Sequence, residues 1–165
     1  MDKTSILIGI GFIALFVIPL LLLSNSGKNK KKKLTLMLRS QAKETGRSIL
    51  LFDLWKTSCI GIDNKEEIIY CVSKSNGNFN KMEIDLKTVS KCILSGYNRS
   101  ENNSRSKSNT KIELQFKFQN PENIKSIEFF DTKVDTFITD DDFRIPEKWL
   151  NIVNSRLLEL SKGKQ

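Results

Sequence analysis

The side chains of this chain that could carry out chemistry are mainly carboxylates. Asp53 and Asp63 flank a short β-forming run, and paired carboxylates can act as general acid and base. Aspartates at strand ends are usually turn residues, so we expect no catalytic pair here. The sequence has no histidine, which excludes Ser-His and Cys-His pairs, and it has no glycine-rich phosphate loop. We therefore predict a protein that is not an enzyme, with no catalytic residue and no cofactor.

Five aspartates near the C-terminus form an acidic cluster: Asp131, Asp135, Asp140, Asp141 and Asp142. Such a cluster could hold calcium, but it lacks the glycine and the distal glutamate of the calcium-loop pattern. The last three precede a helical period, where acidic residues cap a helix and favour its positive end. We expect helix capping and no metal site.

The three cysteines, Cys59, Cys71 and Cys92, are odd in number, and no two form a C-x-x-C pair. This spacing indicates neither a disulfide framework nor a zinc site. We predict free, buried thiols in a reducing compartment.

Two aromatic residues are candidate partner contacts. Trp55 ends a predicted strand beside a polar turn, so it either packs in the core or projects as a binding anchor. Strict alternation places Phe130 on the face opposite Ile127 and Phe129. If that face is solvated, Phe130 contacts a partner. Trp149 lies on a helical apolar stripe and is expected in the core.

The N-terminal stretch 5–23 is apolar and lies in a charge-free window, 4–27. A helix of that length extends about 28 Å, enough to cross the hydrocarbon of a bilayer. A cleaved signal peptide would have a basic leader and a small-residue cleavage site, and neither is present. Residues 1–27 are therefore predicted to be a retained, single-pass transmembrane anchor.

A lysine run follows the predicted span: Lys28, Lys30, Lys31, Lys32 and Lys33. Positive flanks stay on the cytoplasmic side, so we expect the N-terminus outside and the following domain in the cytoplasm, at the cell inner membrane. We also expect these lysines at the membrane surface, near anionic head groups. The net charge is +8, but residues 1–46 carry eight of the 27 Lys and Arg against Asp2 and Glu44 alone. No aromatic residues interleave with the lysines, so nucleic-acid binding is not predicted.

Residues 28–46 are predicted to be a basic juxtamembrane linker with a short amphipathic helix. Leu34, Met37, Leu38 and Ala42 share one helical face, and Gly46 is a natural stop. The helix could lie on the bilayer, dock onto the following domain or act as a simple linker.

Residues 47–165 are predicted to form one cytoplasmic α+β domain. The short connections favour antiparallel pairing, and one C-terminal helix cannot cover both faces of the sheet. We therefore expect a seven-stranded bent sheet or barrel, pleckstrin-homology-like, closed by that helix; a helix lying flat on an open sheet is the alternative. The predicted strands are 48–55, 57–62, 67–73, 80–86, 89–96, 110–118 and 125–131, and the helix is 143–161.

Several short motifs carry a resemblance. They are DLWKTSCIGID at 53–63, IIY at 68–70, IDL-x-x-V-x-K-C at 84–92, I-x-L-x-F at 112–116 and EKWLNIVN at 147–154. Across most of residues 34–160 the chain resembles an uncharacterised family of small bacterial proteins with one N-terminal span and a cytoplasmic domain. The resemblance implies topology and a compact mixed domain, and it implies no activity.

These patterns predict a membrane-tethered binding or scaffolding module. The first hypothesis is a protein partner, bound at an exposed sheet edge or in the groove beside the C-terminal helix. The alternative is an anionic lipid surface, contacted by the lysine flank and by a basic loop around Arg99, Arg105 and Lys107. An enzyme is the third and least favoured hypothesis.

Overall fold

The computed structural model describes residues 29–75, 77–96, 111–120, 123–136 and 141–163. The predicted span 5–23, Lys28, Asp140 and the predicted basic loop lie outside these residues. Within the described ranges, no helix combines the length and the apolar character that a membrane crossing requires.

The described part of the chain is α+β, as predicted, with seven strands and two helices. An N-terminal helix covers residues 29–44 and precedes the first strand. All seven predicted strands are confirmed, and most of their ends are shifted by one or two residues. The elements are β1 (Ile49–Trp55), β2 (Ser58–Asp63), β3 (Ile68–Ser75), β4 (Asn78–Asp85), the 3-10 turn η1 (Leu86–Thr88), β5 (Val89–Ser95), β6 (Lys111–Phe118), β7 (Ile124–Asp131) and α2 (Asp141–Lys162).

The strands form two antiparallel sheets, one in the order β1-β2-β3-β4 and the other in the order β5-β6-β7. The prediction of one continuous bent sheet or barrel is therefore corrected, because no ladder joins the two sheets among the described residues. Side chains take the place of a ladder between β7 and β4, where Lys125 Nζ donates to the Glu83 carbonyl at 2.8 Å. At the corner between the sheets, Asp85 caps η1 and Leu86 is buried.

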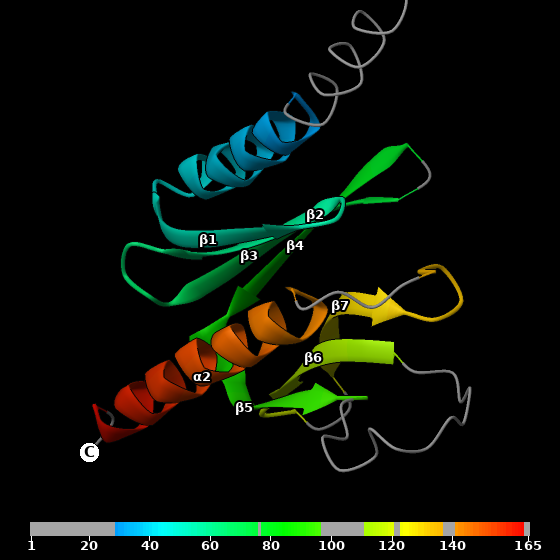
Figure 1. Cartoon of the computed structure of the whole chain (residues 1–165). Helices are drawn as coiled ribbons and strands as arrows, with labels where there is room; N and C mark the ends of the chain where they lie inside the picture. The colour runs from blue at the N-terminus through cyan, green and yellow to red at the C-terminus, as the bar shows by residue number, and fades with distance from the viewer. Residues whose placement is uncertain (1–28, 76, 97–110, 121–122, 137–140, 164–165) are drawn as a thin grey trace, which may run out of the picture.

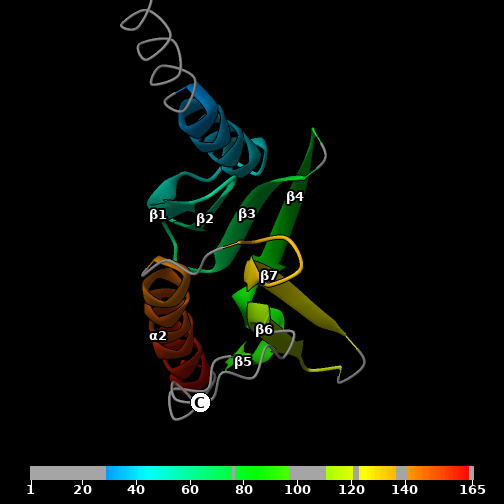
Figure 2. The same cartoon turned by 45° about the vertical axis from the view of Figure 1, so that its right-hand side comes forward.

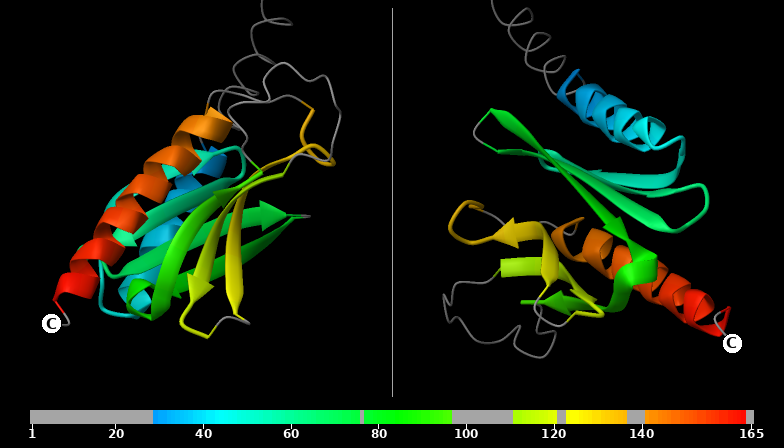
Figure 3. Two further views of the ribbon diagram at one scale, coloured as in Figure 1. Left: turned by 90° about the horizontal axis from the view of Figure 1, so that it is seen from below. Right: turned by 180° about the vertical axis from the view of Figure 1, so that it is seen from behind.

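The N-terminal helix and the second sheet lie on opposite sides of the first sheet (Figures 1 and 3). Leu34, Leu38 and Ala42 are buried against the outer face of β2 and β3, among Tyr70 and Val72. Of the three arrangements open to this helix, the structure therefore has it docked onto the domain. Gly46 ends it with φ of 69°, and the Arg47 amide donates to the Ala42 carbonyl at 2.9 Å.

The main core fills the space between the inner face of the first sheet, the second sheet and α2 (Figure 2). Strand alternation sends Ile60, Ile69 and Ile84 inward, where they meet Trp149 and other side chains of α2. Trp149 is fully buried, as predicted. The helix covers one end of the space between the sheets, and an open cleft remains elsewhere between them.

Candidate binding cleft

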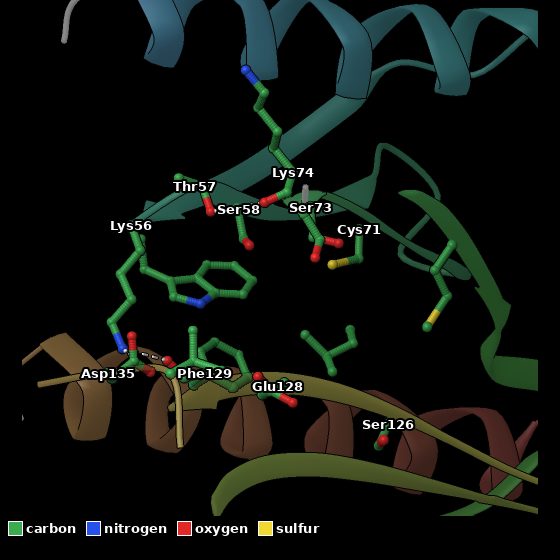
Figure 4. A pocket seen from close by; sticks show the side chains of 15 residues that line it. Lys56, Thr57, Ser58, Cys71, Ser73, Lys74, Ser126, Glu128, Phe129 and Asp135 are labelled. Atoms are coloured by element: carbon green, nitrogen blue, oxygen red, sulfur yellow. Dashed lines mark hydrogen bonds and ion pairs between the residues drawn. The ribbon is translucent and has the colours of Figure 1, made fainter. Parts of the chain in front are cut away.

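A cleft of about 370 Å³ lies between the first sheet and β7 (Figure 4). Its upper wall comes from the β1–β2 turn and from the ends of β3 and β4 that meet in their hairpin. Its lower wall is the stretch 126–129 of β7, with Val134 and Asp135 of the following segment at one side. The two sheets diverge here because no ladder holds them together.

Aromatic stacking forms the inner part of the cleft. The rings of Trp55 and Phe129 lie 4.4 Å apart between centroids, with 24° between their planes. Trp55 is only 5% exposed. Of the two roles open to Trp55, the structure therefore has it packed in the core, because the β1–β2 turn folds the indole inward onto β7 and leaves only a small part of it at the cleft.

Phe130 is also buried, at 2% exposed, so it is not a surface contact in this structure. The physical reason is a β-bulge. Ile112 pairs with Phe130 and Glu113 pairs with Glu128, which leaves Phe129 as an extra residue on β7. The bulge breaks strict alternation, so Phe129 and Phe130 both reach the core.

Lys56 ties the elements at one end of the cleft together. Its Nζ lies 2.8 Å from Asp135 Oδ2 and 2.9 Å from Asp142 Oδ1, and it donates to the Phe129 carbonyl at 3.1 Å. The ammonium also lies 4.7 Å from the centre of the Phe130 ring. Lys56 has φ of 43°, a left-handed backbone that costs a non-glycine residue on the order of 1 kcal/mol. We call these contacts the Lys56 clasp; they join the first hairpin to β7 and to the start of α2.

The clasp explains the predicted acidic cluster. Asp135 and Asp142 converge on the lysine ammonium, and Asp131 accepts the Lys133 backbone amide at 2.8 Å. Among the described residues, no group of His, Cys, Asp or Glu has the arrangement of a metal site. Asp141 and Asp142 do lie in the first turn of α2, where their charge favours the helix.

The rim of the cleft is polar and close to neutral. Ser58 and Ser73 are cross-strand partners on β2 and β3, and Ser126 lies on β7. Lys56 and Asp135 pair with each other at the cleft, and Glu128 also lines it. The ammonium of Lys74 points away from the cleft, toward the N-terminal helix (Figure 4). This balance favours an uncharged polar ligand surface with an apolar contact, and it does not favour a phosphate or another anion.

Cys71 lines the cleft but is a poor nucleophile. The residue is only 7% exposed, and burial raises the pKa of its thiol. Burial likewise raises the pKa of Cys59 to about 11 and that of Cys92 to about 12. The prediction of free, buried cysteines is confirmed.

The two aspartates first considered as a catalytic pair lie at different levels of the first hairpin and have separate roles. Asp53 pairs with Ile60, and its Oδ2 accepts from Lys148 at 2.7 Å and from the Trp149 indole at 2.9 Å. It thereby attaches α2 to β1.

Asp63 organises the β2–β3 turn. It is fully buried, accepts from the Glu67 and Ile68 amides at 2.7 and 2.8 Å, and pairs with Arg47. Burial raises the pKa of its carboxyl, but the hydrogen bonds from Ile68, Arg47 and Glu67 outweigh burial and hold that pKa below 3.8.

The groove predicted beside the C-terminal helix exists in two parts. One, of about 340 Å³, lies between α2 and the end of β2, and includes Ile152 and Arg156. The other, of about 360 Å³, lies between α2 and β5, and includes Leu157 and Leu158. Both lie away from the Lys56 clasp.

Lys30, Lys31, Lys32 and Lys33 occupy the first turns of the N-terminal helix and are exposed. Sequence reasoning missed Lys56 and the serines of the cleft. A lysine in a two-residue hairpin turn carries no sequence signal for a buried acidic partner, because that partner lies 86 residues further along the chain.

The chain was compared with protein-family models, with curated proteins and with solved structures, and none of the three comparisons found a match. The resemblance to a bacterial single-span family therefore stays a prediction.

Proposed function

We propose that this chain is a binding module, tethered to the cytoplasmic face of the cell inner membrane by residues 1–27, that recognises a protein partner through the cleft between its sheets. The observation that carries the proposal is the cleft itself. It combines an aromatic inner part, a polar rim of balanced charge and the free edge of a strand.

The free edge of β7 suggests how a partner would be held. Among the described residues β7 pairs only with β6, and the stretch 126–129 lines the cleft. At one end of this edge the Phe129 carbonyl already accepts from Lys56, which leaves the stretch 126–128 for a partner. A strand edge of this kind can accept an extended peptide, whose backbone supplies hydrogen bonds while alternate side chains enter the cleft.

The order of the elements supports a pleckstrin-homology-like architecture as part of the same proposal. Four strands, a corner, three strands and a terminal helix follow one another in the chain. In that architecture the open side between the sheets, opposite the helix, is where this chain would bind. The proposal assigns binding rather than catalysis, because the chain has no histidine to activate the cleft serines.

The test fills the cleft without touching the core. Ser73 is half-buried on β3 and faces the cleft, so Ser73→Tyr would occupy the space that a partner side chain needs (Figure 4). Ser155→Tyr is the matched control, since Ser155 is an exposed residue of α2 that lines the groove between α2 and the end of β2. Tagged full-length protein is captured from detergent-solubilised membranes, and co-purifying proteins are quantified by mass spectrometry.

The expected result is a partner that is retained by the unaltered chain and by Ser155→Tyr and is lost with Ser73→Tyr. Loss with Ser155→Tyr alone would move the site to the helix groove. Equal recovery of the same proteins with all three chains would overturn the cleft as a binding site. Trp fluorescence of the purified variants checks that each one is folded.

A further inference from the structure

The docked N-terminal helix has an outward face with an unusual composition. Leu34, Leu38 and Ala42 face the first sheet, so residues half a turn away face outward. At 100° per residue the outward stripe is Lys32, Leu36, Arg39 and Lys43. Leu36 is 58% exposed, one of the most exposed large apolar residues in the described chain.

The outward stripe is basic and contains no acidic residue. Lys30, Lys31 and Lys33 add exposed positive charge at its N-terminal end. The one carboxylate of the described helix, Glu44, lies at its last position and faces Lys81 of β4 at 3.5 Å. The guanidinium carbon of Arg39 lies 5.7 Å from the centre of the Phe52 ring, so this cation sits over β1 at the side of the stripe and remains exposed.

We propose that this outward face lies on an anionic lipid surface, with Leu36 entering the interface and the surrounding cations contacting head groups. A leucine surrounded by lysine and arginine on one helical stripe is the pattern of a helix lying in a membrane interface. A polybasic segment is attracted to an anionic leaflet at short range. A protein partner would need an acidic surface with a leucine pocket, which nothing in the chain requires.

Chain length restricts where the helix can lie, and this part of the inference rests on the proposed membrane tether. Only residues 24–28 separate the predicted span from the described helix. Five residues reach at most about 18 Å. A tethered helix therefore starts within reach of head groups, and its basic stripe has the correct sign to contact them.

The proposal also orients the cleft. The N-terminal helix packs on the outer face of the first sheet, whereas the cleft opens on its inner side, between that sheet and β7 (Figures 1 and 4). A bilayer against the outward stripe is thus separated from the cleft by a sheet. Lipid contact would leave the cleft open to the cytoplasm.

The test places a polarity-sensitive fluorophore at position 36. The described chain's three cysteines are buried, so Leu36→Cys supplies the accessible thiol. The labelled full-length chain is reconstituted in vesicles of phosphatidylcholine, with or without phosphatidylglycerol. The same label at Asn151→Cys, an exposed position on α2, is the matched control.

We expect a blue-shifted emission from position 36 in phosphatidylglycerol vesicles, which high salt reverses, and no shift from position 151. Replacing Lys32, Arg39 and Lys43 with Gln should abolish the shift. Replacing the exposed Lys65, Lys133 and Lys162 with Gln should preserve it, at the same change in net charge. Identical emission from position 36 in the two kinds of vesicle would overturn the proposal, and so would a shift that survives the first triple replacement.

Alkaline carbonate extraction of the same vesicles separates this inference from the proposed tether. A chain that is extracted lacks the tether. The label at position 36 is then measured after adding the chain to preformed vesicles: a shift that needs phosphatidylglycerol upholds the lipid-facing stripe without a span, and no shift refutes the stripe as well.

Discussion

The Lys56 clasp gives the sharpest test of how the two sheets are held together. Lys56→Met keeps the length of the side chain and removes its charge. Asp142 is 1% exposed, so it would lose its cation while remaining buried, and the Phe129 carbonyl would lose its donor. Removing one partner of a buried ion pair costs about 3–5 kcal/mol.

The expected cost here is smaller, because the Lys56 and Asp135 side chains are 31% and 21% exposed and water can replace part of the interaction. We expect a loss of about 2–3 kcal/mol in the free energy of unfolding, or roughly 10 °C in Tm for a domain of this size. Thermal unfolding of the full-length chain in detergent, followed by tryptophan fluorescence, measures this loss, since Trp55 and Trp149 are both buried.

Two further variants make the interpretation specific. Lys133→Met removes an exposed lysine from the neighbouring segment and should change stability by less than about 0.5 kcal/mol. Adding Asp142→Asn to Lys56→Met should restore part of the lost stability, because no buried charge then remains unpaired, with a coupling of about 1 kcal/mol or more. A Lys56→Met variant as stable as Lys133→Met would refute the clasp.

Three other outcomes follow from the packing. The pKa of Asp63 is lowered in the folded state, so its contribution to stability is present above the ordinary carboxyl pKa of 3.8 and is lost as pH falls through the lower folded value. The free energy of unfolding should therefore fall more steeply below about pH 4, and Asp63→Asn should flatten that slope in an acid titration. Gly96→Ala should abolish folding or destabilise it strongly, because the added Cβ would lie 1.7 Å from the Lys111 carbonyl oxygen, whereas Gly77→Ala, also at positive φ but in open space, should cost only about 1 kcal/mol in chemical denaturation. Leu38→Ala should cost about 2–5 kcal/mol by leaving a cavity under the docked helix, and Leu36→Ala on the outward stripe should change the same denaturation midpoint little.

Much of the fold follows directly from local pattern. Two elements can be placed from their periodicity alone: β6, from the alternation in Lys111–Phe118, and α2, from its apolar helical stripe. Each of them buries one face against the same core. The docked face of the N-terminal helix was also visible, as Leu34, Leu38 and Ala42. The sequence does not show where that helix lies, because an apolar stripe can pack on a bilayer or on a sheet equally well.

The errors come from long-range geometry. Phe130 was assigned to the wrong face because one extra residue in β7 opposite β6 resets the alternation, and a bulge has no signal in the strand sequence. The closure of the sheets was overestimated because pairing between strands far apart depends on twist and side-chain packing. The cleft was missed for the same reason, since its walls come from β1–β4 and β7, and their separation is set by contacts such as Lys125 to Glu83.

The measurement that tests the central claim most directly is photo-crosslinking in intact cells. A photoreactive benzoylphenylalanine is introduced at Glu128, 48% exposed at the rim of the cleft, or at Lys65, exposed in the β2–β3 turn at the other end of β2 from the cleft. If the cleft recognises a protein at the membrane, position 128 should give one discrete adduct in the membrane fraction, lost with Ser73→Tyr, and position 65 should not give that adduct. The absence of any adduct from position 128, or the same adduct from both positions, would contradict the account.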